Sequence, residues 1–167
     1  TIKLLSKHMC LFDNNFLADI KNITYDKCVS LLMSIDKETN IKFPGAMQKP
    51  NIFWDFIVDN KLKGISSKNC ITAHASGSFS EFLWEFNDDE CKRIMIDELA
   101  KLVNFETIQT KIHKWKYAKP KQVLNYFFKK DKHNQNLIVT GEVFGGAKLE
   151  GAFLSGFNTA NHILDIR

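Results

Sequence analysis

The 167-residue sequence contains no run of about 18 apolar residues, the length that a membrane-spanning helix requires. Its first residues, Thr1–Cys10, also lack the long apolar stretch and the small-residue cleavage site of a signal peptide. The cysteines are widely spaced, with no CxxC or Cys/His pairing: Cys10, Cys28, Cys70 and Cys91. These absences argue against a membrane protein, a metal site and a disulfide framework, and they favour a cytoplasmic protein with reduced thiols.

The chain also has no GxGxxG sequence with an acidic residue about 20 positions beyond it, the pattern of a dinucleotide-binding unit. Its excess charge is small, +4 from 23 Lys and Arg against 19 Asp and Glu. Lysines spread in this way are typical of a solvated surface and argue against a nucleic-acid-binding protein. What the chain does have, 44% hydrophobic residues, is enough for the core of a globular domain.

Short apolar runs separated by turn residues predict strands in the first half of the chain. They are Tyr25–Met33, Ile52–Val58 and Cys70–Ala75, the last closed by a polar turn at Ser76–Ser78. A further strand is predicted at Leu137–Thr140, before a glycine-rich turn. The chain between the first predicted helix and this strand is expected to be irregular.

The first predicted helix begins after Asn87, which can cap it, with Glu90 three residues on as in a capping box. Its apolar residues then follow helical spacing: Cys91, Met95, Leu99, Leu102 and Val103. A second helix is expected from about Gly151 to Ile166. The pattern predicts an α+β fold with a mainly antiparallel sheet flanked by helices. The last strand and helix suit a parallel sheet better, whose other strands are not visible.

The turn between the last strand and helix is the most informative stretch, Thr140–Gly156. A strand delivers the acidic Glu142, glycines let the chain turn without Cβ clashes, and a helix begins near Gly151. The first amides of such a helix are unsatisfied and partially positive, so they can receive an anionic or electron-rich group. The alternative is a helix packed closely through Gly and Ala, with no ligand.

This stretch, TGEVFGGAKLEGAFLSG, resembles the C-terminal flavin-binding signature of the FAD-dependent amine oxidase and renalase superfamily. His113–Pro120 is similar to that family's His-Arg-Trp-Arg-Tyr-Ala-x-Pro segment. Lys63-Gly64 together with Ile71–Ser76 resembles the segment before the family's substrate-domain helix, and Tyr25 with Cys28 resembles an early strand of that domain. The resemblance covers most of the chain from about Tyr25 onward.

The resemblance implies an FAD site in the turn and the first part of the last helix. Its cofactor-binding residues would be Gly141, Glu142, Gly146, Lys148, Leu149, Glu150, Gly151, Ala152 and Ser155. Glu142 would lie near the ribityl and pyrophosphate part of FAD, and the Leu149 amide near N1 and O2 of the isoalloxazine. Lys148 stands where Arg is usual. Trp115 and Tyr117 would face the flavin or the substrate cavity, unless they are ordinary core anchors.

The resemblance also implies a domain organisation and a reaction. Residues 1–135 would form the substrate-binding domain, and residues 136–167 would complete a split, Rossmann-type FAD-binding domain whose N-terminal half is missing. The complete enzyme would transfer a hydride from an amine or a reduced nicotinamide-type substrate to flavin N5, and oxygen would reoxidise the flavin. The chain alone is expected to be inactive, and no residue is identified as a catalytic base.

A different class of function stays open, a non-catalytic module that binds single-stranded nucleic acid or a protein partner. Aromatic residues alternate with lysines in Lys114–Tyr117 and again in Tyr126–Lys130. Among single residues, His74 is interpreted as a satisfied core histidine. Ser78 and Ser80 lack the strand–turn–helix context of a nucleophile elbow.

Overall fold

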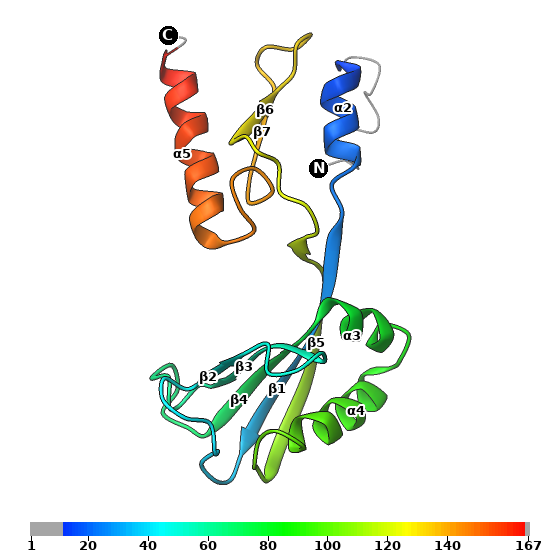
Figure 1. Cartoon of the computed structure of the whole chain (residues 1–167), viewed down its shortest axis with the longest axis vertical. Coiled ribbons are helices and arrows are strands. Elements are labelled where there is room, and N and C mark those ends of the chain that lie inside the picture. Colours follow the sequence, from blue (N-terminus) through cyan, green and yellow to red (C-terminus); the bar gives the residue numbers. More distant parts are fainter. Residues whose placement is uncertain (1–11, 166–167) are drawn as a thin grey trace. The chain divides into compact units, whose positions relative to one another are not determined.

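A computed structural model describes residues 12–165. The fold is α+β, as predicted, with a mainly antiparallel five-stranded sheet flanked by helices and a separate two-stranded sheet (Figure 1). The chain divides into two compact units. The sheet unit is Asp26–Ala118, and the terminal unit combines Thr1–Tyr25 with Lys119–Arg167. None of the helices within residues 12–165 has the length and apolar character needed to cross a membrane.

The five-stranded sheet has the order β2-β3-β4-β1-β5. Its strands are β1 (Tyr25–Ile35), β2 (Ala46–Gln48), β3 (Trp54–Asp59), β4 (Cys70–Ala75) and β5 (Thr107–Pro120). The pairs β2–β3, β3–β4 and β4–β1 are antiparallel. The three strands predicted in the first half of the chain are therefore confirmed as β1, β3 and β4.

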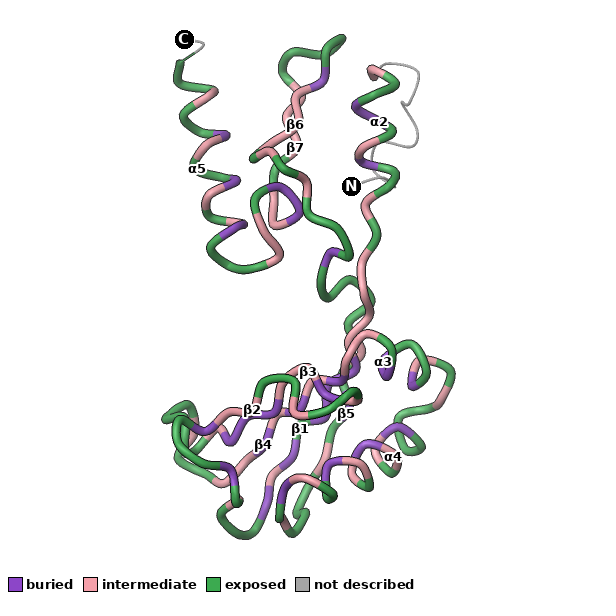
Figure 2. The backbone as a smooth tube through the Cα atoms, viewed as in Figure 1, coloured by how far each residue is buried: buried purple, intermediate pink, exposed green. Residues whose placement is uncertain are grey.

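Two helices, α3 (Gly77–Leu83) and α4 (Asp88–Ala100), pack on one face of this sheet. In β4, for example, Ile71 and Ala73 belong to the same core as Leu83 of α3 and Met95 and Leu99 of α4. Figure 2 shows the buried positions gathered on the strands and along one side of α4. Because successive residues of a strand point to opposite faces, the alternate residues lie on the face away from these helices.

The capped start of α4 is confirmed. The Asn87 side chain accepts from the amides of Asp89 and Glu90, and the Glu90 carboxylate accepts from the Asn87 amide in return. Strand β4 does end before Ser76–Ser78, as predicted, but this segment opens α3 instead of forming a turn, because Ser76 caps the helix through a hydrogen bond from the Phe79 amide. Ser78 and Ser80 therefore do follow a strand and open a helix. Ser80 is nevertheless buried and bonded to backbone, so it is not a nucleophile elbow.

The irregular chain expected after α4 is also wrong, because it contains the 14-residue strand β5. Most of β5 is exposed, since it is the last strand in the order of the sheet. An edge strand with lysines at many positions carries little apolar alternation, and lysines on an edge oppose pairing with other chains. This is why periodicity alone did not reveal it.

The terminal unit contains helices α2 (Asn14–Lys21) and α5 (Leu149–Asp165) and strands β6 (Phe128–Lys130) and β7 (Ile138–Thr140). The predicted last strand and helix are thus present. They were expected to belong to a parallel sheet, but β7 pairs with β6 in the antiparallel direction. A loop of seven residues joins β6 to β7, which is short enough for an antiparallel hairpin and too short for a parallel crossover.

The two compact units do not coincide with the functional division at residue 135 that the resemblance implied. The terminal unit takes residues from both ends of the chain because α2 packs on the β6–β7 hairpin. Phe16, Leu17 and Ile20 of α2 form one small core with Leu137 and Val139. The assignment of residues 1–135 to substrate binding stays a prediction about function.

Candidate functional site

The glycine-rich turn lies between β7 and α5, where the sequence placed it. Gly141, Gly145 and Gly146 have φ angles of 145°, 124° and 140°, a region that side chains with a Cβ rarely adopt. The turn is closed by hydrogen bonds from the Phe144 amide to the Gly141 carbonyl and from the Gly146 amide to the Glu142 carbonyl. Three glycines are therefore required by the backbone path itself.

The turn folds directly against the first turn of α5. A Cβ on Gly151 would lie 2.2 Å from the carbonyl oxygen of Gly146 and 2.6 Å from its Cα. Gly151 is accordingly buried by the chain's own backbone. Of the two interpretations of this glycine, close packing therefore explains Gly151 fully, and Gly146 is its packing partner.

Ser155, another of the predicted cofactor residues, has no exposed surface. Its hydroxyl accepts from the Gly141 amide at 2.9 Å, lies 2.6 Å from the Thr140 hydroxyl and donates to the Phe127 carbonyl. All its hydrogen-bonding capacity is used within the terminal unit. Ser155 therefore ties α5 to the end of β7, and its direct contact with a cofactor stays a prediction.

The N-terminal end of α5 is open. Leu149 is 90% exposed, Lys148 and Glu150 are exposed, and Ala152 is half-buried and donates its amide to the Lys148 carbonyl. Within residues 12–165 no acceptor meets the amides of Leu149 and Glu150. Such amides carry the positive end of the helix dipole, so they fit an electron-rich ligand edge.

Glu142 is half-buried on the turn that precedes this helix end. It lies near enough to Tyr25 for its charge to add to the effect of burial, which raises the pKa of the Tyr25 phenol. The turn thus presents one carboxylate and two free amides, the donor and acceptor groups that the resemblance implied for a flavin.

The predicted substrate residues Trp115 and Tyr117 lie on β5 in the sheet unit. Ile112 is buried, and Lys114 donates to the Phe86 carbonyl, so these two residues point to the helix-covered face. By alternation Trp115 and Tyr117 point to the other face, which we call the open face. They are 51% and 70% exposed, so they are not core anchors.

The open face also carries a polar group that sequence reasoning missed. Ser30 of β1 pairs with His74 of β4, and the Ser30 hydroxyl lies 2.8 Å from His74 Nδ1. Cys28 Sγ lies 3.9 Å from the same nitrogen. Because Nδ1 is engaged, Nε2 is the ring nitrogen that can meet a ligand. The only signal in the sequence was that Cys28, Ser30 and His74 occupy alternate positions of their strands.

Burial sets the titration of this group. It lowers the pKa of His74, and the charge of Asp55 opposes this effect without reversing it. Burial also raises the pKa of the Cys28 thiol, although the hydrogen bond with Ser30 acts in the opposite direction. Both groups are therefore held neutral. His74 was predicted to be a satisfied core histidine: its Nδ1 does have a partner in Ser30, but the side chain is half-buried on the open face and does not belong to the core.

A hollow of about 310 Å³ lies on the same strands, one residue pair further along. Its lining from the open face is Leu32, Ser34, Cys70, Thr72, Gln109 and Lys111. Thr72 pairs with Leu32 next to the Ser30–His74 pair, and residues two apart in a strand are about 7 Å apart. The open face therefore combines a hollow, a histidine and two exposed aromatic residues.

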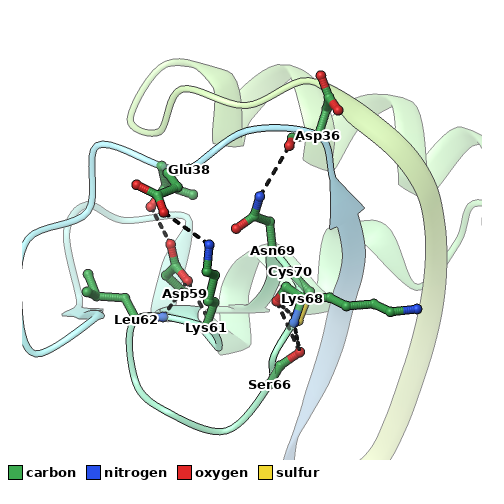
Figure 3. Close-up of polar contacts among 10 residues, drawn as sticks. Asp36, Glu38, Asp59, Lys61, Leu62, Ser66, Lys68, Asn69 and Cys70 are labelled. Carbon is green, nitrogen blue, oxygen red and sulfur yellow. Dashed lines mark hydrogen bonds and ion pairs between the residues drawn. The ribbon is translucent and has the colours of Figure 1, made fainter.

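A second hollow, of about 460 Å³, lies among the loops of the sheet unit (Figure 3). The buried Asp59 accepts from the Thr39 hydroxyl and from the amides of Lys61 and Leu62, while Lys61 pairs with Glu38 at 3.0 Å. These polar groups bond to one another and hold the loops together. Their positions are therefore explained without a ligand in the hollow.

We also looked for a metal site among the titratable groups of the described residues. In the part of the chain from residue 12 to 165, no three His, Cys, Asp or Glu side chains come together as ligands. Cys28, Cys70 and Cys91 are free thiols, and Cys10 lies outside the described residues.

The chain matches no protein-family profile, and no curated protein shows significant sequence similarity to it.

Proposed function

We propose that this chain is part of an FAD-dependent oxidoreductase of the renalase and amine-oxidase type. It would supply the substrate-binding sheet and the last strand and helix around the flavin, with the dinucleotide-binding half provided by sequence outside this chain. When bound, FAD would supply the chemistry: it would take a hydride from an amine or a reduced nicotinamide-type substrate, with oxygen as the final electron acceptor.

The observation that carries the proposal is the N-terminus of α5. Its amides at Leu149 and Glu150 have no acceptor within residues 12–165, and the turn before them is built from glycines that have no side chains. Donors aimed at the pyrimidine edge of a flavin stabilise the negative charge that reduction places there. Lys148, exposed beside them, adds a positive charge without the planar fork of arginine.

The open face supplies the substrate side of the proposal. Trp115 and Tyr117 offer aromatic surfaces against which a planar or organic cationic substrate stacks. His74 is held neutral by burial and fixed by Ser30, and it would accept a proton at Nε2 in the tautomer whose Nδ1–H donates to the Ser30 hydroxyl. A neutral imidazole suits an amine, which must lose its proton before it gives up a hydride.

The first test is the absorbance spectrum of the full-length protein, purified natively. Two flavin bands, in the near ultraviolet and the visible, that bleach on adding reduced nicotinamide support the proposal. A colourless protein that FAD cannot reconstitute removes the enzyme interpretation and leaves the glycine turn as packing.

A pair of variants tests the α5 amide itself. Proline at the first helical position is compatible with the helix but has no N–H, so Leu149→Pro removes one donor and Leu149→Ala keeps it. We expect Leu149→Pro to weaken FAD binding roughly 10-fold or more, the loss of one hydrogen bond to a charged group, while Leu149→Ala binds normally. Equal binding by both variants means that the amide does not contact the flavin.

The second candidate is a module for single-stranded nucleic acid. The exposure of Trp115 and Tyr117 on one strand favours it, since bases stack on such residues. Lys114 weakens it, because its ammonium is bound to the Phe86 carbonyl on the other face. A gel shift in low salt decides: no shift removes this candidate, and a salt-sensitive shift lost in Trp115→Ala supports it.

A further inference from the structure

One side of α5, which we call the apolar face, is exposed along the whole helix. Its large residues keep between 43% and 90% of their surface accessible: Leu149, Phe153, Phe157, Ile163 and Leu164. At 3.6 residues per turn, these residues share one side of the helix with Gly156 and Ala160. Of the charged residues of α5, Asp165 falls outside this side and Glu150 lies at its edge, next to Phe157.

The opposite side of α5 is the one that packs within the terminal unit, and it consists of small or polar residues. Gly151, Ser155 and Thr159 are its buried members. Figure 2 shows the buried positions of α5 recurring along one side of the helix. The usual arrangement is therefore reversed, since a helix normally buries its apolar stripe. The apolar face is built to contact something else.

Gly156, in the middle of this face, has no explanation inside the terminal unit. It is exposed, and a Cβ built on it would meet no atom within 4 Å. A glycine inside a helix destabilises it relative to alanine, so it is expected where another backbone or a large side chain comes close. Ala160, one turn later, extends this small patch.

We propose that two copies of the chain pair through the apolar face, with their α5 helices antiparallel and crossing at Gly156. The spacing of the residues specifies the register. When Gly156 of one copy faces Phe157 of the second copy, Phe153 faces Ala160 and Leu149 faces Leu164. Every phenylalanine then lies opposite a small residue, the large-against-small arrangement that closely packed interfaces need.

The alternative orientation lacks this complementarity. In a parallel pair each residue faces its own counterpart, so Phe153 and Phe157 would meet themselves and Gly156 would leave a gap. Antiparallel helices also align their dipoles favourably. The five large side chains offer on the order of 600 Å² per copy, the low end of the roughly 600–1,000 Å² per partner that specific interfaces bury, so a dimer of moderate affinity is expected.

The test is the molecular mass of the chain in solution, measured by sedimentation over a range of concentrations. We expect a monomer–dimer equilibrium in which Phe153→Glu lowers the dimer affinity at least 10-fold. Phe43→Glu, at an 85% exposed position in the sheet unit, is the matched control and should leave it unchanged. A chain that stays monomeric overturns the proposal and assigns the face to a segment of a longer protein or to another partner.

An exchange of residues tests the register. Gly156→Phe alone places two phenylalanines opposite each other and should dissociate the dimer, whereas Gly156→Phe combined with Phe157→Gly restores a large–small pair and should restore association. Circular dichroism checks that α5 remains helical in each variant. Failure of the double variant to recover overturns the antiparallel register, and a dimer insensitive to Phe153→Glu places the interface elsewhere. None of these outcomes depends on flavin binding.

Discussion

The two units of this chain reach stability by different means. The sheet unit buries eighteen apolar residues, whereas the terminal unit buries five among the described residues. In place of a large core, the terminal unit buries polar side chains that hydrogen-bond to backbone: Asp131, Ser155 and Thr159. Phe16 and Phe144 are buried in it, but the large apolar residues Phe153, Phe157 and Leu164 are exposed on α5.

This difference indicates which unit is complete. A polar group that is buried and hydrogen-bonded contributes modestly to stability, while buried apolar area contributes about 25 cal/mol per Å². The sheet unit therefore buries enough apolar surface to fold as an independent domain. The terminal unit has fixed its geometry through specific hydrogen bonds and has left its apolar surface for a partner, which agrees with both proposals above.

The largest expected effect comes from the core of the sheet unit. Leu99 on α4 is fully buried, so Leu99→Ala removes packed methyl groups and leaves a cavity. We expect a loss of about 2–5 kcal/mol in the free energy of unfolding, measured by urea denaturation. Leu164→Ala on α5 is the matched control, since Leu164 is 62% exposed and its truncation should cost under about 0.5 kcal/mol. Equal costs at both positions would contradict the contrast between the units.

The terminal unit should respond most to Asp131. This fully buried carboxylate accepts from the Asp13 amide at 2.8 Å and from the Asn134 amide at 2.6 Å, so it ties the start of α2 to the loop after β6. Asp131→Ala leaves two amides without their acceptor and should cost about 1–3 kcal/mol. Hydrogen exchange of the α2 amides measures it, and unchanged protection there would argue that Asp131 is not the tie.

The elements that sequence predicted well are those with local signals. The cap at Asn87, the alternation in Cys70–Ala75 and the glycine turn before α5 each depend on a few neighbouring residues. The missed elements depend on distant contacts. Strand β5 is held by β1, across more than 70 residues, and α2 is positioned through Asp13 by Asp131, 118 residues away.

The candidate site divides in the same way. Sequence placed Glu142 at the end of the last strand and began the helix at about Gly151; the structure ends β7 at Thr140, has Glu142 in the turn and begins α5 at Leu149, two residues earlier than predicted. The sequence could not show that Gly151 packs directly against the backbone of Gly146, because this contact depends on how tightly the turn folds back onto α5. The sequence also could not predict the contact between Ser30 and His74, because neither strand alone determines the register in which β1 pairs with β4.

A smaller effect is expected from the cap of α4, which lies in the sheet unit but outside its core. Asn87→Ala removes the acceptor for two amides and breaks the reciprocal bond to Glu90, and it should cost about 1 kcal/mol. Thermal unfolding followed by circular dichroism measures it. Asn87→Ser, which preserves the capping oxygen, should recover most of the loss, and a variant that stays as unstable as Asn87→Ala would point to a different role for this residue.

The mildest test uses pH, because His74 in the sheet unit and Asp131 in the terminal unit have pKa values shifted from their ordinary ones. Burial lowers the pKa of His74, so the sheet unit favours neutral His74 and should lose stability as pH falls from the ordinary value of 6.5 toward the lowered one. For Asp131, burial alone would raise the pKa, but the backbone hydrogen bonds from Asn134 and Asp13 outweigh it and lower the pKa below 3.8. The terminal unit should therefore hold until pH falls below about 4 and then weaken, since protonation removes the acceptor. Residue-resolved exchange at pH 7, 5.5 and 3.5 separates the two windows, and His74→Gln should abolish only the upper one.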